Sequence, residues 1–180
     1  MKHVLLTYFI VAVANLGISL ASAQEMPKPQ QEHKFLEKFV GEWDSKMEAS
    51  GMPGQPAMEC QGVHKAKMMG PFWIVSAGNS KMMGQPMESI MQLGFDPKKK
   101  KYVGTWSDSI SDHMWQYEGT LEGNTLTLNT EGPNMMSPGK MAKYRDVIEF
   151  KSPDHYTLSS TMQGDDGGWK TFMLADFKKK

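Results

Sequence analysis

Residues 101–131 read KYVGTWSDSISDHMWQYEGTLEGNTLTLNTE, and this stretch decides the fold. Three runs rich in Thr, Tyr, Trp, Val and Leu, at about 101–109, 113–121 and 124–131, are separated by Gly, Asn, Asp and Ser. Runs of these residues bounded by turn-forming residues predict short β-strands. The three-residue turn at 122–124 permits an antiparallel hairpin, whereas parallel strands need crossovers of about a dozen residues or more. The stretch therefore predicts an antiparallel meander.

The same pattern continues on both sides of this stretch. Before it, Phe35, Leu36, Phe39 and Val40 recur at helical spacing, which predicts a short N-terminal helix. The full chain then predicts an all-β fold, an antiparallel up-and-down barrel whose closure removes exposed strand edges. The strands are expected at about 42–50, 57–68, 72–80, 87–95, 101–109, 113–121, 124–131, 142–151, 155–163 and 169–177.

The N-terminus has the features of a secretion signal. A basic start at residues 1–3 precedes an apolar run at 4–20, and Ala21-Ser22-Ala23 fits the small-x-small pattern of a cleavage site. We predict a signal peptide over 1–23, a polar linker over 24–31 and one barrel domain over 32–180. The mature protein is then expected to be periplasmic or extracellular, with no membrane insertion after cleavage.

Charge and cysteine content limit the classes of partner. The predicted signal holds one of the 20 basic residues and none of the 20 acidic ones, so the mature chain carries a net charge of about −1. This balance argues against a nucleic-acid partner, which favours a basic face. Cys60 is the single cysteine, so no intramolecular disulfide forms. The oligomeric state is left open.

Alternation along the strands predicts which side chains face the interior. Trp43 faces inward in the first strand, and Phe172 with Leu174 in the last. In the eighth strand Tyr144 and Asp146 alternate with Arg145, which is expected to face outward. A small-molecule cavity has apolar walls with a few polar groups. The residues expected to line such a cavity are Met58, Cys60, His64, Met87, Met91, Tyr102, Trp106, Asp108, Trp115, Tyr117 and Tyr156.

The same residues also fit a barrel whose core is filled by its own side chains. About eight strands enclose an interior that is either just packed or just wide enough for one ligand. Composition does not distinguish a ligand-binding barrel from a structural or interaction barrel. The inward polar residues favour a cavity, because polar side chains are poor filler for a solid core. These residues are Cys60, His64, Asp108 and Ser160.

Several motifs together resemble a known family. Gly41-Glu42-Trp43 after a short helix is similar to the Gly-x-Trp signature of lipocalin-like barrels. The stretches 82–88, 94–97, 101–109, 118–120 and 145–148 add to this, and together they resemble a bacterial calycin-like family of uncharacterised proteins, DUF1579. The resemblance implies a barrel in which Gly41 and Trp43 are structural and a basic side chain packs over the Trp43 ring. Arg145, the only arginine, is one candidate for that contact, and binding of a ligand carboxylate is its alternative role.

Methionine is unusually frequent, with 17 in the chain. Thioethers select Cu(I), so a Met-based copper-binding protein is one hypothesis. The alternative is that flexible Met side chains form adaptable apolar walls. No common catalytic or phosphate-binding motif is present, and no spacing predicts a cofactor. The sequence thus predicts an exported, non-enzymatic protein that binds a small apolar or amphipathic molecule.

Overall fold

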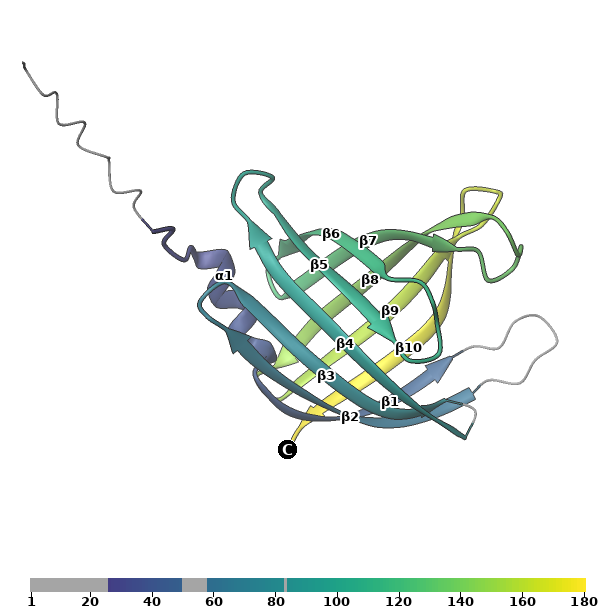
Figure 1. Cartoon of the computed structure of the whole chain (residues 1–180), viewed down its shortest axis with the longest axis horizontal. Coiled ribbons are helices and arrows are strands. Elements are labelled where there is room, and N and C mark those ends of the chain that lie inside the picture. Colours follow the sequence, from purple (N-terminus) through teal and green to yellow (C-terminus); the bar gives the residue numbers. More distant parts are fainter. Residues whose placement is uncertain (1–25, 50–57, 83) are drawn as a thin grey trace, which may run out of the picture.

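The computed structural model describes residues 26–49, 58–82 and 84–180. Ten antiparallel strands form one closed barrel, as predicted (Figure 1). Each strand lies within a few residues of its predicted position. The strands are β1 (Gly41–Ala49), β2 (Met58–Met69), β3 (Trp73–Met82), β4 (Gln85–Asp96), β5 (Lys101–Asp108), β6 (Trp115–Glu122), β7 (Thr125–Pro133), β8 (Met141–Ser152), β9 (His155–Gln163) and β10 (Trp169–Lys179).

Each strand pairs with its neighbours in sequence, and β1 closes the ring by pairing with β10. The closing register joins Trp43 to Lys179 and Ala49 to Met173. No strand edge is left open around this ring, which removes the aggregation hazard of an unpaired edge. The up-and-down topology predicted from the short turns is confirmed.

A short helical segment covers one end of the barrel. It consists of α1 (Gln31–Phe35) and the 3-10 helix η1 (Leu36–Phe39), next to the ends of β2 and β3 in Figure 1. Its apolar side chains Phe35, Leu36 and Phe39 are buried, because helical spacing places them on the face turned toward the barrel. There they pack against Trp43, Tyr102, Phe150 and Tyr156.

Trp43 anchors this covered end. Its indole Nε1 donates a hydrogen bond of 2.8 Å to the Phe39 carbonyl, and the side chain is 1% exposed. The Lys179 ammonium lies 5.4 Å from the ring centroid. Gly41 has a φ of 138°, and an added Cβ there would lie 2.5 Å from Lys179 Cε. Glycine at this position therefore leaves room for the lysine to reach the tryptophan.

The candidate contact between Arg145 and Trp43 is wrong. Arg145 faces outward, as its alternation predicts, and its guanidinium stacks 4.1 Å from the ring centroid of Trp169. Its Nε also donates a hydrogen bond to the Asn129 side chain. Lys179 takes the place over Trp43 because β10, not β8, is the strand paired with β1.

A β-bulge in β10 changes the predicted face of Leu174. The register with β9 shifts between Thr171 and Met173, so that Phe172 is the extra residue. Phe172 faces the interior and contacts the Tyr144 ring, whereas Leu174 is 53% exposed. The prediction that both share the inward face is wrong, because an extra residue reverses the alternation that follows it.

The predicted signal peptide over 1–23 lies outside the described residues. Of the predicted linker, residues 26–30 have no regular structure, and α1 begins at Gln31, one residue before the predicted domain start. Among the described residues, no helix has the length and apolar character needed to cross a membrane.

Candidate functional site

The interior of the barrel differs between its two ends. A side chain that points into a closed barrel meets solvent only if the interior contains open space. Next to the helix, the inward residues Ile74, Leu93 and Leu126 are 0% exposed. We call this end the filled half. Toward the other end, the inward residues Ser76, Met91, Trp106 and Leu158 are partly exposed although they lie within strands. This end is therefore less tightly packed, although Cys60, Met87 and Tyr144 are buried there, and we call it the hollow half.

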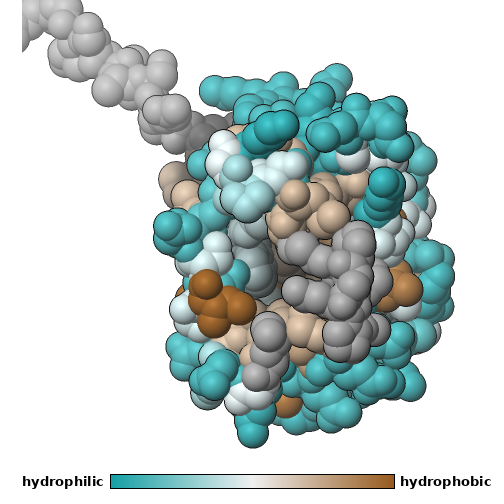
Figure 2. All heavy atoms as spheres, turned by 90° about the vertical axis from the view of Figure 1, so that its right-hand side faces the viewer, coloured by the Kyte–Doolittle hydropathy of each residue, from teal (hydrophilic) through white to brown (hydrophobic). Residues whose placement is uncertain are grey.

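The hollow half opens at the end of the barrel away from the helix. Figure 2 looks at this end and shows a recess bordered by hydrophobic side chains within a hydrophilic outer surface. Strand number accounts for the space, because a barrel of about eight strands is just filled by its own side chains. Ten strands enclose a wider interior, and the helical segment fills only one end of it.

The structure separates the predicted cavity residues into two groups. Tyr102 and Tyr156 belong to the filled half, so their prediction as cavity lining is wrong. Tyr102 is 2% exposed and donates a hydrogen bond to the Glu32 carbonyl, and Tyr156 stacks on Phe177 at 4.3 Å. Alternation assigned the correct face, but the helical segment decides which inward residues are covered. The other predicted residues also face inward, but to different degrees. Cys60, Met87 and Tyr117 are buried, and His64 contacts the Phe177 ring of the filled half at 5.1 Å. The partly exposed ones are Met58, Met91, Trp106, Asp108 and Trp115.

Aromatic rings form one wall of the hollow half. Trp115 packs edge-on against Tyr144 with ring centroids 4.8 Å apart, and Tyr144 contacts Phe172 at 5.9 Å. Trp106 is the register partner of Trp115 on the neighbouring strand. Gly132 faces the same wall, and an added Cβ there would lie 2.3 Å from the Trp115 ring. In this wall Trp106 and Trp115 are partly exposed, whereas Tyr144 is buried between its neighbours.

A half-buried carboxylate lies beside this aromatic wall. Asp146 faces inward from β8, and the Tyr117 hydroxyl donates a hydrogen bond of 2.8 Å to its Oδ2. Burial raises the pKa of Asp146, although hydrogen bonds from Ser160 and Tyr117 oppose this shift. Burial also raises the pKa of Tyr117 well above its usual value, so the phenol keeps its proton. Asp146 is absent from the predicted cavity residues, although its alternation with Arg145 places it on the inward face.

Two further polar side chains face the interior. His64 lies over Gly78, where an added Cβ would be 2.7 Å from the imidazole and 2.5 Å from Ser89 Oγ. Burial lowers the pKa of His64, so the neutral imidazole is favoured. Thr130 pairs with Tyr144 across β7 and β8, and its buried hydroxyl has no hydrogen-bond partner within the described part of the chain.

Sulfur atoms gather where β1, β2 and β3 approach the open end. The Cys60 thiol lies 3.6 Å from the Met82 thioether, and Met47 is the register partner of Cys60.

Asp108, at the end of β5, accepts a hydrogen bond from the backbone N–H of Ile110. Its carboxylate therefore shapes the turn after β5. Within the described ranges, no three His, Cys, Asp or Glu side chains are grouped so that they could hold a metal ion.

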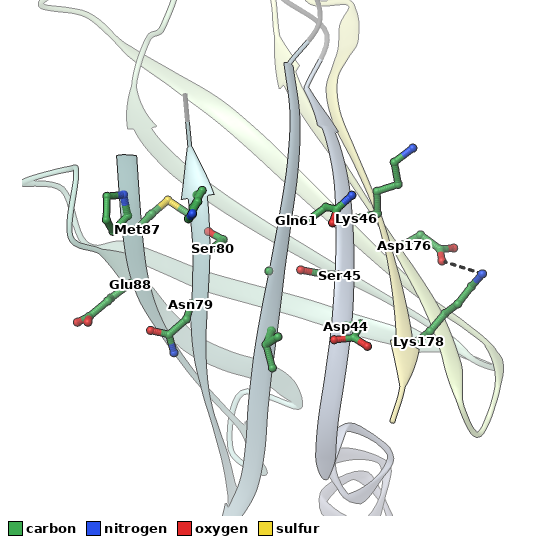
Figure 3. A pocket seen from close by; sticks show the side chains of 14 residues that line it. Asp44, Ser45, Lys46, Gln61, Asn79, Ser80, Met87, Glu88, Asp176 and Lys178 are labelled. Carbon is green, nitrogen blue, oxygen red and sulfur yellow. Dashed lines mark ion pairs between the residues drawn. The ribbon is translucent and has the colours of Figure 1, made fainter. Parts of the chain in front are cut away.

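A second hollow lies on the outer surface of the barrel. It is a groove of about 1020 Å³ across β10, β1, β2, β3 and β4 (Figure 3). Its floor is the backbone of Ser45, Gly62, Ser80 and Met87, which pair across these strands and belong to the inward-facing set. Its sides are outward residues of both charges, among them Asp44, Lys46, Glu88, Asp176 and Lys178. This charged, open groove is unsuited to an apolar molecule.

Comparison with known proteins identifies the family. The family described as "Protein of unknown function (DUF1579)" matches residues 28–179. The chain belongs to this family, as its motifs predicted. No curated protein is a detectable relative.

Two solved structures share the fold. The S-type phycobiliprotein lyase CPES from Guillardia theta has a TM-score of 0.57 at 16% identity, covering 84% of this chain and 98% of its own. Rv2717c from M. tuberculosis has a TM-score of 0.56 at 11% identity, covering 85% of this chain and 99% of its own. At identities this low, the TM-scores show a shared barrel fold alone.

The comparison corrects one prediction. The absence of common catalytic motifs led us to predict a non-enzymatic protein. A barrel of the same architecture is named a lyase, which contradicts that prediction. Motifs of other folds are therefore no guide to whether a barrel of this kind is an enzyme.

Proposed function

We propose that this DUF1579 protein binds a small apolar or amphipathic molecule in the hollow half of its barrel. One observation carries the proposal: inward residues well within β3, β4, β5 and β9 remain in contact with solvent. Space lined mainly by apolar and aromatic side chains, with a few polar groups, is the usual form of a small-molecule site.

The distribution of flexible and rigid side chains supports the same proposal. Met87 and Met91 face inward from β4, where Met91 is the register partner of Trp106. Methionine adapts its shape to irregular apolar surfaces. The filled half instead uses interlocked rings, including Trp43, Phe150 and Tyr156. Adaptable side chains at the hollow half suit a surface that must pack against a guest.

A matched pair of variants on β4 tests the proposal. The neutral fluorescent dye Nile red is expected to bind the wild-type protein with a blue shift and increased emission. Met91→Trp fills the lumen and should weaken dye binding at least about tenfold, because the bulky ring occupies the apolar space that the dye would use. Ile90→Trp places the same ring on the outside, since Ile90 is 55% exposed, and should bind as the wild type does.

Circular dichroism establishes that both variants are folded before the dye titration. Equal binding by folded Met91→Trp and by the wild type would place the dye outside the lumen and contradict the proposal. Native mass spectrometry of protein purified from its own host without refolding adds a second measurement, in which a bound mass should accompany the wild type and be reduced in Met91→Trp.

Cu(I) binding is a second candidate, favoured by the contact of 3.6 Å between the Cys60 and Met82 sulfur atoms. Two soft donors at this separation fit one soft metal ion. In a titration against a Cu(I) chelator, the wild type should compete for copper and Met82→Leu should compete less. Met69→Leu changes an exposed thioether and serves as the control. A wild-type protein that takes no copper from the chelator would eliminate this candidate.

We also propose that the protein acts outside the cytoplasm after removal of residues 1–23. The apolar run and the Ala21-Ser22-Ala23 site support export. N-terminal sequencing of protein recovered from its host should begin at Gln24. A protein that retains Met1 in the cytoplasmic fraction would contradict this proposal.

A further inference from the structure

We infer that the molecule held in the hollow half carries a nitrogen that is cationic or bears N–H groups, and that Asp146 receives it. This inference rests on the proposed function, and it adds the chemical class of the ligand. Asp146 pairs with Leu128 on β7 and with Ser160 on β9, and both partners face the interior.

The Asp146 carboxylate lacks a positive partner. Its hydrogen bonds come from the hydroxyl groups of Tyr117 and Ser160, and among the described residues it forms no ion pair. Lys170, which pairs with Met162 near the open end, is exposed and makes no ion pair with Asp146. The carboxylate oxygens therefore keep acceptor capacity that the protein does not use, since an ionised carboxylate has about four acceptor sites.

Partial burial without a cation makes this carboxylate selective. A buried charge is unfavourable unless a charge of opposite sign or a full set of hydrogen bonds accompanies it. A ligand ammonium group would supply both, and it would favour the ionised form of Asp146. A ligand carboxylate would meet a like charge or a protonated acid, and it would lose its own hydration in either case.

The aromatic wall favours the same chemistry. Trp115 and Tyr144 lie on the strands that carry Tyr117 and Asp146, each two residues away and on the same face. The faces of Trp and Tyr rings attract cations, and aromatic walls are a known means of recognising ammonium groups. The Asp146 carboxylate and the faces of the neighbouring Trp115 and Tyr144 rings together form a site of negative electrostatic potential.

Thr130 offers one more acceptor at this place. Its hydroxyl is buried and has no partner in the described part of the chain, and it lies beside Tyr144 in the β7–β8 register. A buried hydroxyl without a hydrogen-bond partner destabilises a protein. A ligand N–H group that reaches this oxygen would remove that penalty, so Thr130 and Asp146 together point to a nitrogen donor.

Displacement of Nile red by two amphiphiles of equal chain length tests the inference. Dodecylammonium and dodecanoate are compared below the concentrations at which they form micelles. Dodecylammonium should displace the dye from the wild type at a concentration at least about tenfold lower than dodecanoate does. Asp146→Asn keeps the shape of the side chain and should bring the two concentrations within about twofold of each other, while Nile red itself binds as before.

Two variants sharpen the outcome. Glu131→Gln removes an exposed, outward carboxylate from β7 and should leave the preference for dodecylammonium unchanged. Tyr117→Phe removes a hydrogen-bond donor from Asp146 and should increase the preference, because the carboxylate is then less compensated. This second variant keeps the inference testable even if Asp146→Asn does not fold.

The outcomes separate the inference from the proposed function. If Nile red does not bind the wild type, the proposed function fails and the inference fails with it. If Nile red binds, but both amphiphiles displace it equally from the wild type, the inference alone is overturned. A preference for dodecylammonium that persists in Asp146→Asn also overturns the inference, because a group other than Asp146 would then bind the ammonium.

Discussion

The filled half and the hollow half are built from opposite ends of the same ten strands, yet their inward side chains differ in kind. The filled half holds Trp43, Tyr102, Phe150 and Tyr156, which interlock with the phenylalanines of the helical segment. The hollow half combines inward Met and Ser residues of β3 and β4 with the contacting rings of Trp115, Tyr144 and Phe172. The comparison indicates that the helical segment supplies the packing that fixes the barrel. The strands alone leave space at the other end.

The largest expected effect tests this division with two tryptophans. Trp43→Ala should lower the free energy of unfolding by about 3–5 kcal/mol, because it leaves a cavity in a packed core and breaks the bond to Phe39. Trp106→Ala should lower it by about 1–2 kcal/mol, since this ring is already in contact with open space. Urea denaturation followed by circular dichroism measures both. Equal losses would show that the two halves are packed alike.

Enlarging a side chain gives the next largest difference. Leu93 and Met91 are neighbours on the inward face of β4, and Leu93 is 0% exposed whereas Met91 is partly exposed. Leu93→Trp should destabilise the barrel by about 1–3 kcal/mol, because overpacking forces the surrounding side chains out of place. Met91→Trp should change stability by no more than about 0.5 kcal/mol. A strong loss of stability in Met91→Trp would mean that the lumen at this level is already full.

Local sequence signals were sufficient for the fold. Alternation along strands and short turns depend on neighbouring residues, so ten strands and an antiparallel meander could be predicted from them. Gly41-Glu42-Trp43 marked the covered end for the same reason, since it directly follows the helical segment. Arg145 was correctly placed on the outer face by alternation with Tyr144 and Asp146.

Features that depend on distant pairing could not be predicted in this way. Tyr102 was assigned to the cavity because alternation gives the face of a residue and not its depth. Leu174 was placed inside because the bulge at Phe172 leaves no mark in the hydrophobic pattern. Lys179 meets Trp43 only through the closure of β1 on β10, which joins residues far apart in sequence. The charge of Asp146 inside an inward apolar series is one signal that the sequence did contain.

The half-buried carboxylate of the hollow half should make stability depend on pH. Burial raises the pKa of Asp146 in the folded protein above that of the unfolded chain, which is about 3.9. As pH rises, the Asp146 carboxyl loses its proton at a lower pH in the unfolded chain than in the folded protein. The free energy of unfolding therefore falls as pH rises from about 4 through the folded pKa. Asp146→Asn should raise the melting temperature at pH 7 and change it less at pH 4.

Thermal unfolding of wild type and Asp146→Asn at the two pH values measures this effect. Glu131→Gln, which alters an exposed carboxylate, should show no such pH-dependent difference. An equal change in melting temperature at pH 4 and pH 7 for Asp146→Asn would mean that the carboxylate is ionised without penalty in the folded barrel.

The smallest expected effect compares two cation–π contacts, both made to tryptophan rings. Lys179 lies over Trp43 at the end of the filled half, whereas Arg145 lies over Trp169 outside the hollow half. Exposed contacts of this kind contribute about 0.5–1 kcal/mol. Lys179→Gln should therefore reduce stability by at most about 1 kcal/mol, because hydrogen bonding and packing already fix Trp43. Arg145→Gln should have a similar effect on urea denaturation and leave Nile red binding unchanged, since its side chain points away from the lumen. A loss of dye binding in Arg145→Gln would place this arginine in the binding site and contradict the outward orientation of its side chain.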